Sequence, residues 1–363
     1  MDKHACPPAA AQEHDAPSFR VGVQEKAMQA ASAHPLLRAV FMGTPEFAAT
    51  ILRKVLDCPH VQVVAAYSQP DRPAGRGKKL VKPAVKLLAE ERGIPVHQPL
   101  NFAKNEQGDA AVAELAAYKP DVLLVAAYGL ILPQRVLDIP SAMPINVHAS
   151  LLPKYRGAAP VQRAIMEGDA VTGVTIMRME AGLDSGPILM QRAVGIGMDQ
   201  SSADLHEELA QEGGDLLTMA LERLRAGALA EIPQDETRAT HAPKLSKEEG
   251  FPDLSLPAYK LHAHIRGVTP WPGATLTLHR EGHEPLAVRV LPGTPLPDGE
   301  GVCRNESPGS IVGIENNAVH MRCGDGVYAL SSLRPAAGKN MDGQAFANGY
   351  LAASSGAYFT GKC

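Results

Sequence analysis

The chain up to about residue 227 alternates short apolar runs with amphipathic stretches. Runs of strand length lie at 37–42, 61–67, 94–97, 121–128 and 145–148. Helical patterns separate the earlier runs, at 45–56, 84–92 and 108–118. This alternation predicts a mostly parallel sheet flanked by helices, which is the α/β class. Two later runs, 174–179 and 187–194, are expected to close the sheet as a pair of strands.

A long helix is predicted over residues 202–225. Ser201 and Asp204 stand at capping-box spacing before it. Leucines recur along one side of the helix and form an apolar stripe, which favours packing against the sheet. The stripe consists of Leu205, Leu209, Leu216, Leu217, Leu221 and Leu224.

The pattern changes after Gly227. Polar and proline-containing residues 233–250 are typical of an interdomain linker. Short runs between turn residues follow, and they predict a small antiparallel β-barrel, OB-like, over residues 251–350. These runs are 274–278, 286–290, 310–314, 318–321 and 327–330. The predicted organisation is therefore a disordered extension at 1–35, an α/β domain at 36–232, the linker, the barrel, and a tail at 351–363.

Composition excludes several classes of protein. The 363 residues are 45% hydrophobic and 20% charged, as expected of a folded chain with about two domains. A formal net charge of -4 shows no overall preference for a polyanion. The five cysteines form no C-x-x-C pair, which favours a reducing compartment and argues against a zinc site. No apolar run reaches membrane-spanning length, so we expect a cytoplasmic protein without a membrane partner.

Candidate chemistry lies where strands end. Asn146 and His148 are two residues apart on one predicted strand and point to the same face. Asp184 stands between glycines in a later loop. An amide, an imidazole and a carboxylate can together run acyl transfer to an amine, by stabilising an oxyanion and moving a proton. The residues alone leave open the alternative that His148 is a satisfied core histidine and Asp184 a turn residue.

Three features limit other interpretations. Residues 72–86 carry a run of basic side chains around two glycines, which indicates either phosphate contact or a solvated loop. The turn at Gly43 lacks the G-x-G-x-x-G pattern, which argues against dinucleotide binding. His262 and His264 have no third ligand nearby in the sequence and do not indicate a metal site.

Several long motifs closely resemble those of the methionyl-tRNA formyltransferase family. They occur in order between about residues 37 and 350, and the match continues into the second domain with 244–249 and 270–272. The resemblance implies a Rossmann-like formyltransferase domain followed by the barrel. It also implies transfer of a formyl group from 10-formyltetrahydrofolate to the amino group of methionyl initiator tRNA. The longest motifs are 41–48, 69–79, 146–160 and 182–186.

The resemblance assigns roles to individual residues. Asn146, His148 and Asp184 match the catalytic residues. Ser150, Leu151, Leu152 and Pro153 match the tetrahydrofolate-binding loop, and Ile131 and Leu132 are expected to line the pterin pocket. The residues expected to contact tRNA are Arg72, Arg76, Lys78 and Lys79. No metal is expected, and the chain is expected to act as a monomer.

Two alternatives remain beside this interpretation. The chain could be another 10-formyltetrahydrofolate-dependent formyltransferase or hydrolase, since these share the Asn, His and Asp chemistry. It could also be an RNA- or nucleotide-binding module in which those residues are idle. The basic stretch at 72–86 and the second domain argue against a small ribonucleotide as acceptor.

Overall fold

A computed structural model describes residues 36–74, 79–297, 306–352 and 356–362 of the chain. The predicted extension at 1–35 lies outside the described residues. The α/β prediction is confirmed, because one seven-stranded sheet has the order β5-β2-β1-β6-β7-β8-β9. The first five strands in this order, β5, β2, β1, β6 and β7, are parallel. Strand β8 runs antiparallel to β7, and β9 runs antiparallel to β8. The strands are β1 (Leu37–Gly43), β2 (Val61–Tyr67), β5 (Val96–His97), β6 (Val122–Ala126), β7 (Met143–His148), β8 (Val171–Arg178) and β9 (Ile188–Gly195).

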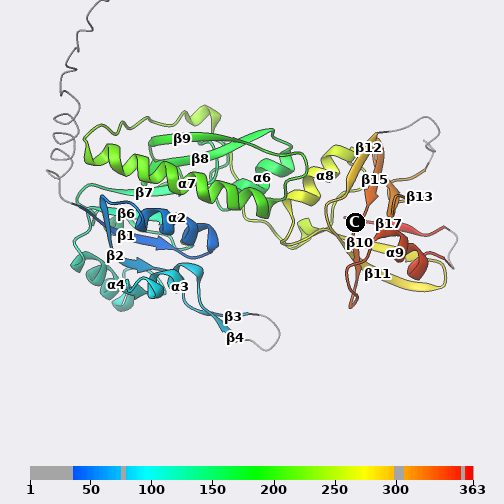
Figure 1. The fold of residues 1–363 in the computed structure, drawn as a ribbon, viewed down its shortest axis with the longest axis horizontal. Coiled ribbons are helices and arrows are strands. Elements are labelled where there is room, and N and C mark those ends of the chain that lie inside the picture. Colours follow the sequence, from blue (N-terminus) through cyan, green and yellow to red (C-terminus); the bar gives the residue numbers. More distant parts are fainter. Residues whose placement is uncertain (1–35, 75–78, 298–305, 353–355, 363) are drawn as a thin grey trace, which may run out of the picture. The chain divides into compact units, whose positions relative to one another are not determined.

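Helices cover both faces of this sheet (Figure 1). Alternate residues of β1 enter opposite cores, as the two-residue period of a strand requires. Ala39 and Phe41 pack with α2 and α7, whereas Val40 and Met42 pack with α4 and α5. The helices are α2 (Glu46–Leu56), α3 (Ala84–Glu91), α4 (Glu106–Ala117), α5 (Gln134–Leu137), α6 (Pro160–Glu167) and α7 (Ser202–Arg225).

Helix α7 begins with the predicted capping box. The Ser201 side chain accepts from the backbone N–H of Asp204, and the Asp204 carboxylate accepts from the backbone N–H of Ser201 at 2.9 Å. The predicted leucine stripe packs against the sheet. At Gly213 the helix comes so close to β7 that an added Cβ would lie 2.9 Å from a methyl carbon of Val147. Helix α7 therefore packs directly against the strand that carries Asn146 and His148.

The predicted antiparallel second domain is confirmed. Its two four-stranded sheets have the orders β16-β11-β10-β17 and β12-β15-β14-β13. An antiparallel bridge between Ser310 and Tyr358 joins them at one edge, and a single core lies between them. The domain also contains α8 (Ala258–Gly267) and α9 (Gly343–Tyr350). The strands are β10 (Thr275–Arg280), β11 (His283–Val290), β12 (Thr294–Pro297), β13 (Ile311–Glu315), β14 (Ala318–Arg322), β15 (Gly326–Leu330), β16 (Leu333–Pro335) and β17 (Tyr358–Thr360).

The ends of this domain differ in detail from the sequence pattern. Strand β17 lies in the segment expected to be a tail, and it pairs with β10.

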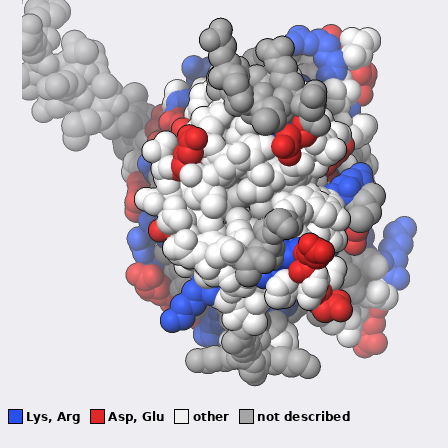
Figure 2. All heavy atoms as spheres, turned by 90° about the vertical axis from the view of Figure 1, so that its right-hand side faces the viewer, with Lys and Arg blue, Asp and Glu red and all other residues white. Residues whose placement is uncertain are grey.

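Helix α8 carries both histidines that had no third ligand. His262 bonds to Tyr328 Oη, and His264 bonds to the backbone carbonyl of Glu249. Figure 2 shows the side of the molecule that carries this domain, with charged residues mainly at its rim and uncharged surface at its centre.

A glycine comparison tests the packing of α7 against β7. We expect Gly213→Ala to lower the denaturation midpoint, because the added methyl group must displace Val147 in a close-packed core. The matched control is Gly349→Ala in α9, where an added Cβ meets nothing within 4 Å. There the better helix propensity of alanine should stabilise the protein by about 0.5–1 kcal/mol. Equal stabilisation by both substitutions in chemical denaturation would contradict the packing account.

Candidate active site

Strand β7 presents two polar side chains at its carboxyl end. Asn146 pairs with Val125 of β6 on one side and with Met177 of β8 on the other. Val147, between Asn146 and His148, belongs to the core beneath α7. The alternation therefore directs Asn146 and His148 to the opposite face, as predicted from their spacing.

The loop that follows β7 is tied to β8 and β9. The Thr175 hydroxyl donates to the Ser150 carbonyl at 2.6 Å and accepts from the Leu152 backbone N–H at 3.1 Å. The Gln191 side chain donates to the Leu152 carbonyl at 2.8 Å. The Ser150 hydroxyl donates to the Lys154 carbonyl at 2.6 Å, which closes the turn that contains Pro153. The four residues predicted to bind tetrahydrofolate therefore form one tightly held loop.

His148 is buried, with 6% of its surface exposed, and one of its ring nitrogens is committed to the backbone. Its Nε2 lies 2.9 Å from the Tyr155 carbonyl oxygen. A carbonyl only accepts hydrogen bonds, so Nε2 carries a proton and donates it there. In the neutral imidazole, Nδ1 is then the atom with a free lone pair. This assignment makes Nδ1 the nitrogen available for proton transfer.

Asp184 faces that nitrogen. Its Oδ2 lies 3.7 Å from His148 Nδ1 and accepts from the Gly157 backbone N–H at 2.8 Å. The separation to Nδ1 exceeds a normal hydrogen bond, and catalytic contacts often tighten only when substrate binds. The structure therefore brings Asp184 and His148, both predicted site residues, close together.

The side chain of Asn146 is the third polar group of the cluster. It is partly exposed, and within the described residues its amide makes no hydrogen bond. An amide N–H with no protein acceptor is able to donate to an oxygen atom of a ligand. Asn146, His148 and Asp184 thus combine a free donor, a buried imidazole and a carboxylate.

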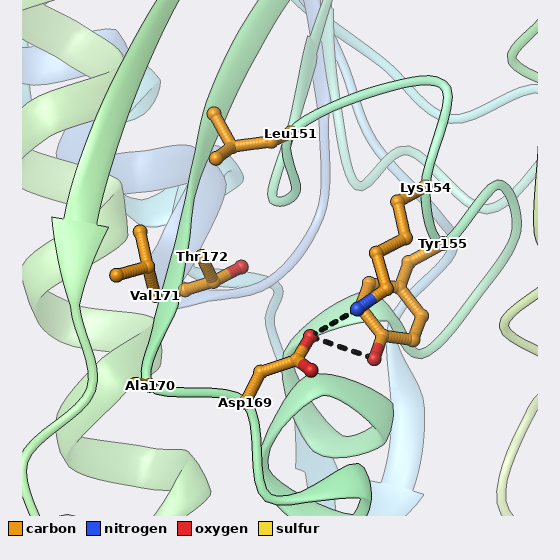
Figure 3. Close-up of a pocket in the computed structure, with 7 residues that line it drawn as sticks. All are labelled: Leu151, Lys154, Tyr155, Asp169, Ala170, Val171 and Thr172. Atoms are coloured by element: carbon orange, nitrogen blue, oxygen red, sulfur yellow. Dashed lines mark hydrogen bonds and ion pairs between the residues drawn. The ribbon is translucent and has the colours of Figure 1, made fainter. Parts of the chain in front are cut away.

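Tyr155 has an unfavourable backbone conformation, and contacts of its side chain hold it in place. Its φ of 66° is uncommon for a residue with a side chain, and such strain persists only where the surroundings hold it. Its hydroxyl donates to Asp169 at 2.8 Å, and Lys154 Nζ lies 2.6 Å from the same carboxylate oxygen (Figure 3). Burial together with this bond raises the pKa of the phenol. The contacts of the tyrosine side chain therefore help to fix the backbone carbonyl that accepts the hydrogen bond from His148 Nε2.

Lys154, Tyr155 and Asp169 line a cavity of about 280 Å³ beside the loop that follows β7. Leu151, Ala170 and Val171 form its apolar wall (Figure 3). Thr172 also lines it, and the buried hydroxyl of Thr172 makes no hydrogen bond in the structure. His148 is not among the residues that line this cavity, and it contacts the loop through the backbone carbonyl of Tyr155.

Other predicted site residues are distributed differently. Leu132 packs in the core beside β6, whereas Ile131 is 91% exposed. Arg72 begins a short hairpin of β3 (Arg72–Ala74) and β4 (Lys79–Val81), and it donates to the Gln69 side chain at 2.9 Å. Arg76 and Lys78 lie outside the described residues.

Two cations of the basic stretch are already paired. Lys86 lies 2.9 Å from Asp71, and Lys82 lies 2.8 Å from Glu90. The pKa of Asp71 is lowered by its hydrogen bonds to Gln98 and Lys86. These pairs reduce the positive charge that the stretch offers to an external anion.

The structure also reveals polar residues that the sequence analysis did not assign. Arg156 is 5% exposed and binds Glu236 and Gln234 of the predicted linker. Tyr155 and Arg156 stand inside the family-like motif, but nothing in the linear sequence shows which groups they contact. The described residues contain no cluster of three or more His, Cys, Asp and Glu side chains suited to a metal ion. None of the described helices has the length and apolar character needed to span a membrane.

Comparison with known proteins identifies the two halves of the chain. Residues 37–221 match the family model described as formyl transferase, and residues 244–351 match the formyl transferase C-terminal domain. Methionyl-tRNA formyltransferase of Nitratidesulfovibrio vulgaris (strain DP4) is 50% identical over 322 residues, covering 88% of this chain and 95% of that protein. The Pseudomonas fluorescens protein of the same name is 48% identical over 306 residues, covering 84% and 91%.

Solved structures share the fold at lower identity. An N-formyltransferase from Helicobacter canadensis, in complex with folinic acid and dTDP-3-aminofucose, gives a TM-score of 0.57 at 15% identity, covering 81% of this chain and 98% of that one. HypX from Aquifex aeolicus, in complex with tetrahydrofolic acid, gives 0.55 at 17%, covering 88% and 48%. The matches to both family models, over more than half of the chain, define it as a formyl transferase. The high identity over nearly the full length of the relatives goes further: the chain belongs to the methionyl-tRNA formyltransferase family.

The ring geometry of His148 makes a spectroscopic prediction. We expect the neutral imidazole to be the Nε2–H form alone, because the Tyr155 carbonyl accepts from that nitrogen. Nitrogen-15 NMR of histidine-labelled protein, assigned with a His148→Gln variant, distinguishes the two tautomers by their chemical shifts. A neutral His148 protonated on Nδ1 would contradict the assignment.

Proposed function

We propose that this chain transfers the formyl group of 10-formyltetrahydrofolate to the amino group of methionyl initiator tRNA. The observation that carries the proposal is the cluster at the end of β7, where His148 Nδ1 faces Asp184 at 3.7 Å beside the unpaired amide of Asn146. The relatives that share up to 50% of the sequence carry the name of this activity. The held loop from Ser150 to Pro153 supplies a rigid wall suited to a flat heterocycle.

Formyl transfer forms one C–N bond, breaks another, and moves one proton from the amine to N10 of the folate. The neutral methionyl amine attacks the formyl carbon, a new C–N bond forms, and the formyl oxygen becomes an oxyanion. The Asn146 amide donates to that oxygen, which stabilises the tetrahedral intermediate. The bond from carbon to N10 of the folate then breaks. The amine loses one proton and N10 gains one, so the reaction is balanced.

His148 is placed to carry that proton. Its Nε2 proton is engaged with Tyr155, so neutral His148 accepts the amine proton at Nδ1 and becomes an imidazolium. The carboxylate of Asp184 faces this atom and stabilises the positive charge. The charged ring then offers its Nδ1 proton to the oxyanion or to N10. Asp184 therefore acts through His148, with its own position set by Gly157.

The remaining assignments concern the tRNA and the organisation of the chain. We assign tRNA contacts to the β3–β4 hairpin and its connection, through Arg72, Arg76, Lys78 and Lys79. The second domain is assigned to holding the tRNA, with the catalytic domain at 36–232, the linker at 233–250 and the barrel at 251–350. Residues 72–86 carry a run of basic side chains, which favours the hairpin as a source of phosphate contacts. A monomer in the cytoplasm suffices for this chemistry.

Removing the oxyanion donor tests the catalytic assignment. We expect Asn146→Ala to lower kcat by about 100-fold, because one donor contributes on the order of 3 kcal/mol to the transition state. The KM for 10-formyltetrahydrofolate should stay within about threefold, since the contact forms fully only at the transition state. The measurement is transfer of labelled formyl to methionyl initiator tRNA. A variant of Asn146 or His148 with wild-type turnover would show that these residues are not catalytic.

A second substitution tests the tRNA assignment. Arg76→Ala should raise the KM for methionyl initiator tRNA, with a smaller salt dependence than that of the wild type, because one phosphate contact is lost. Binding of 10-formyltetrahydrofolate, measured by calorimetry, should be unchanged. Equal weakening toward both substrates would contradict a specific role in tRNA binding.

A further inference from the structure

The chain from Ile232 into the segment expected to be an interdomain linker, 233–250, is bonded to the loops of the candidate site and to β9. Ile232 forms reciprocal backbone bonds of 2.8 and 2.9 Å with Ile188 at the start of β9. Further on, the Arg156 N–H donates to the Thr240 carbonyl at 2.8 Å, and the Ala242 N–H donates to the Arg156 carbonyl at 2.7 Å. The segment 232–242 is therefore bonded to the loop after β7 and to the strand that follows the Asp184 loop.

Gln234 lies near the start of this segment and bridges the two loops. Its Nε2 donates to the backbone carbonyls of Asp184, at 2.8 Å, and Gly186, at 2.7 Å. Its Oε1 accepts from Arg156 Nε at 3.1 Å and from a terminal guanidinium nitrogen at 2.8 Å. A primary amide has two donor hydrogens and two acceptor lone pairs. All four are used, and every one of them binds a loop of the site.

Arg156 fixes the direction in which this amide points. It is buried and binds both carboxylate oxygens of Glu236 at 2.8 Å. Hydrogen bonding to Glu236 raises the pKa of Arg156 and lowers that of Glu236. A guanidinium only donates, so the oxygen of Gln234 must face Arg156. The nitrogen is thereby directed at the two carbonyls of the Asp184 loop.

The Asp184 loop needs such support. Asp184 has a φ of 49°, in the left-handed region that costs energy for a residue with a side chain. Gln234 binds the carbonyl of this strained residue, and Gly157 binds its carboxylate. Rotation of the unsupported backbone would carry Oδ2 away from its place 3.7 Å from His148 Nδ1. Small displacements of catalytic groups have large kinetic effects.

We infer that Gln234 is a positioning residue for formyl transfer, holding the Asp184 loop in register with His148 through its two carbonyl contacts. The inference rests on the proposed function and extends it to the segment that joins the two domains. It makes the start of this segment a structural part of the active site. Gln234 touches no reacting atom in this account, because its four hydrogen bonds all go to the protein.

Two substitutions and a control test this role. Gln234→Ala removes the bridge, and we expect kcat to fall about tenfold or more with the KM of both substrates within about threefold. The control is Gln134→Ala, since that amide makes an exposed bond of 2.7 Å to Asp138 just after α5. Control kcat and KM should equal those of the wild type. Thermal unfolding of each variant shows whether the folded state is retained.

The isosteric Gln234→Glu separates positioning from general packing. A carboxylate keeps the contact to Arg156 but cannot donate to the carbonyls of Asp184 and Gly186. Protonation restores one donor, so we expect its activity relative to the wild type to recover as the pH is lowered. Gln234→Ala has no such group, and its relative loss should not recover in this way.

Nitrogen-15 NMR of His148 without substrate reports on the same geometry independently of transfer. We expect the Nδ1 chemical shift of His148 to change in both Gln234 variants and to stay unchanged in Gln134→Ala, because the carboxylate facing Nδ1 moves. An unchanged chemical shift together with wild-type kcat would overturn the inference. So would a loss of thermal stability alone, with wild-type kcat in the folded protein. If the wild type transfers no formyl group to tRNA, the proposed function fails, while the NMR comparison still decides the role of Gln234.

Discussion

The arrangement of the site depends on one hydrogen bond, between His148 Nε2 and the Tyr155 carbonyl at 2.9 Å. This bond settles which ring nitrogen carries the proton in the neutral form and leaves Nδ1 for chemistry. It requires the Tyr155 backbone to adopt a conformation that is unfavourable for a side-chain residue. The contact from the Tyr155 hydroxyl to Asp169, and the bonds from the same loop to Thr240, supply the support that this conformation requires.

Asp184 also has a left-handed backbone conformation, which contacts from other segments must support. Asn146 and His148 lie on β7, whereas Asp184 and the carbonyl that binds His148 lie on loops, and these loops are held by segments distant in sequence. Thr175 and Gln191 hold the loop after β7 from the sheet side, and Gln234 joins it to the Asp184 loop. The rigid sheet behind them, with α7 seated on Val147, provides the reference for all of these contacts.

The periodicity of the sequence predicted most of the fold, because β1, β2, β7 and α7 have strong apolar patterns and clear end signals. It did not predict the β3–β4 hairpin, whose strands are short and basic, or β17, whose pairing with β10 is non-local. Asn146, His148 and Asp184 were predicted from motif and spacing. The roles of Arg156 and Gln234 were not, since their partners lie up to 80 residues away and polar pairing leaves no periodic trace.

The proposed reaction transfers formyl from 10-formyltetrahydrofolate to an amine on a tRNA. The direct measurement is the fate of labelled formyl when methionyl initiator tRNA, glycinamide ribonucleotide and water compete as acceptors. We expect label in formylmethionyl-tRNA, with a specificity constant for the tRNA at least about 100-fold above that for the ribonucleotide, a margin of some 2.7 kcal/mol. Label that passes mainly to the ribonucleotide or to formate would contradict it.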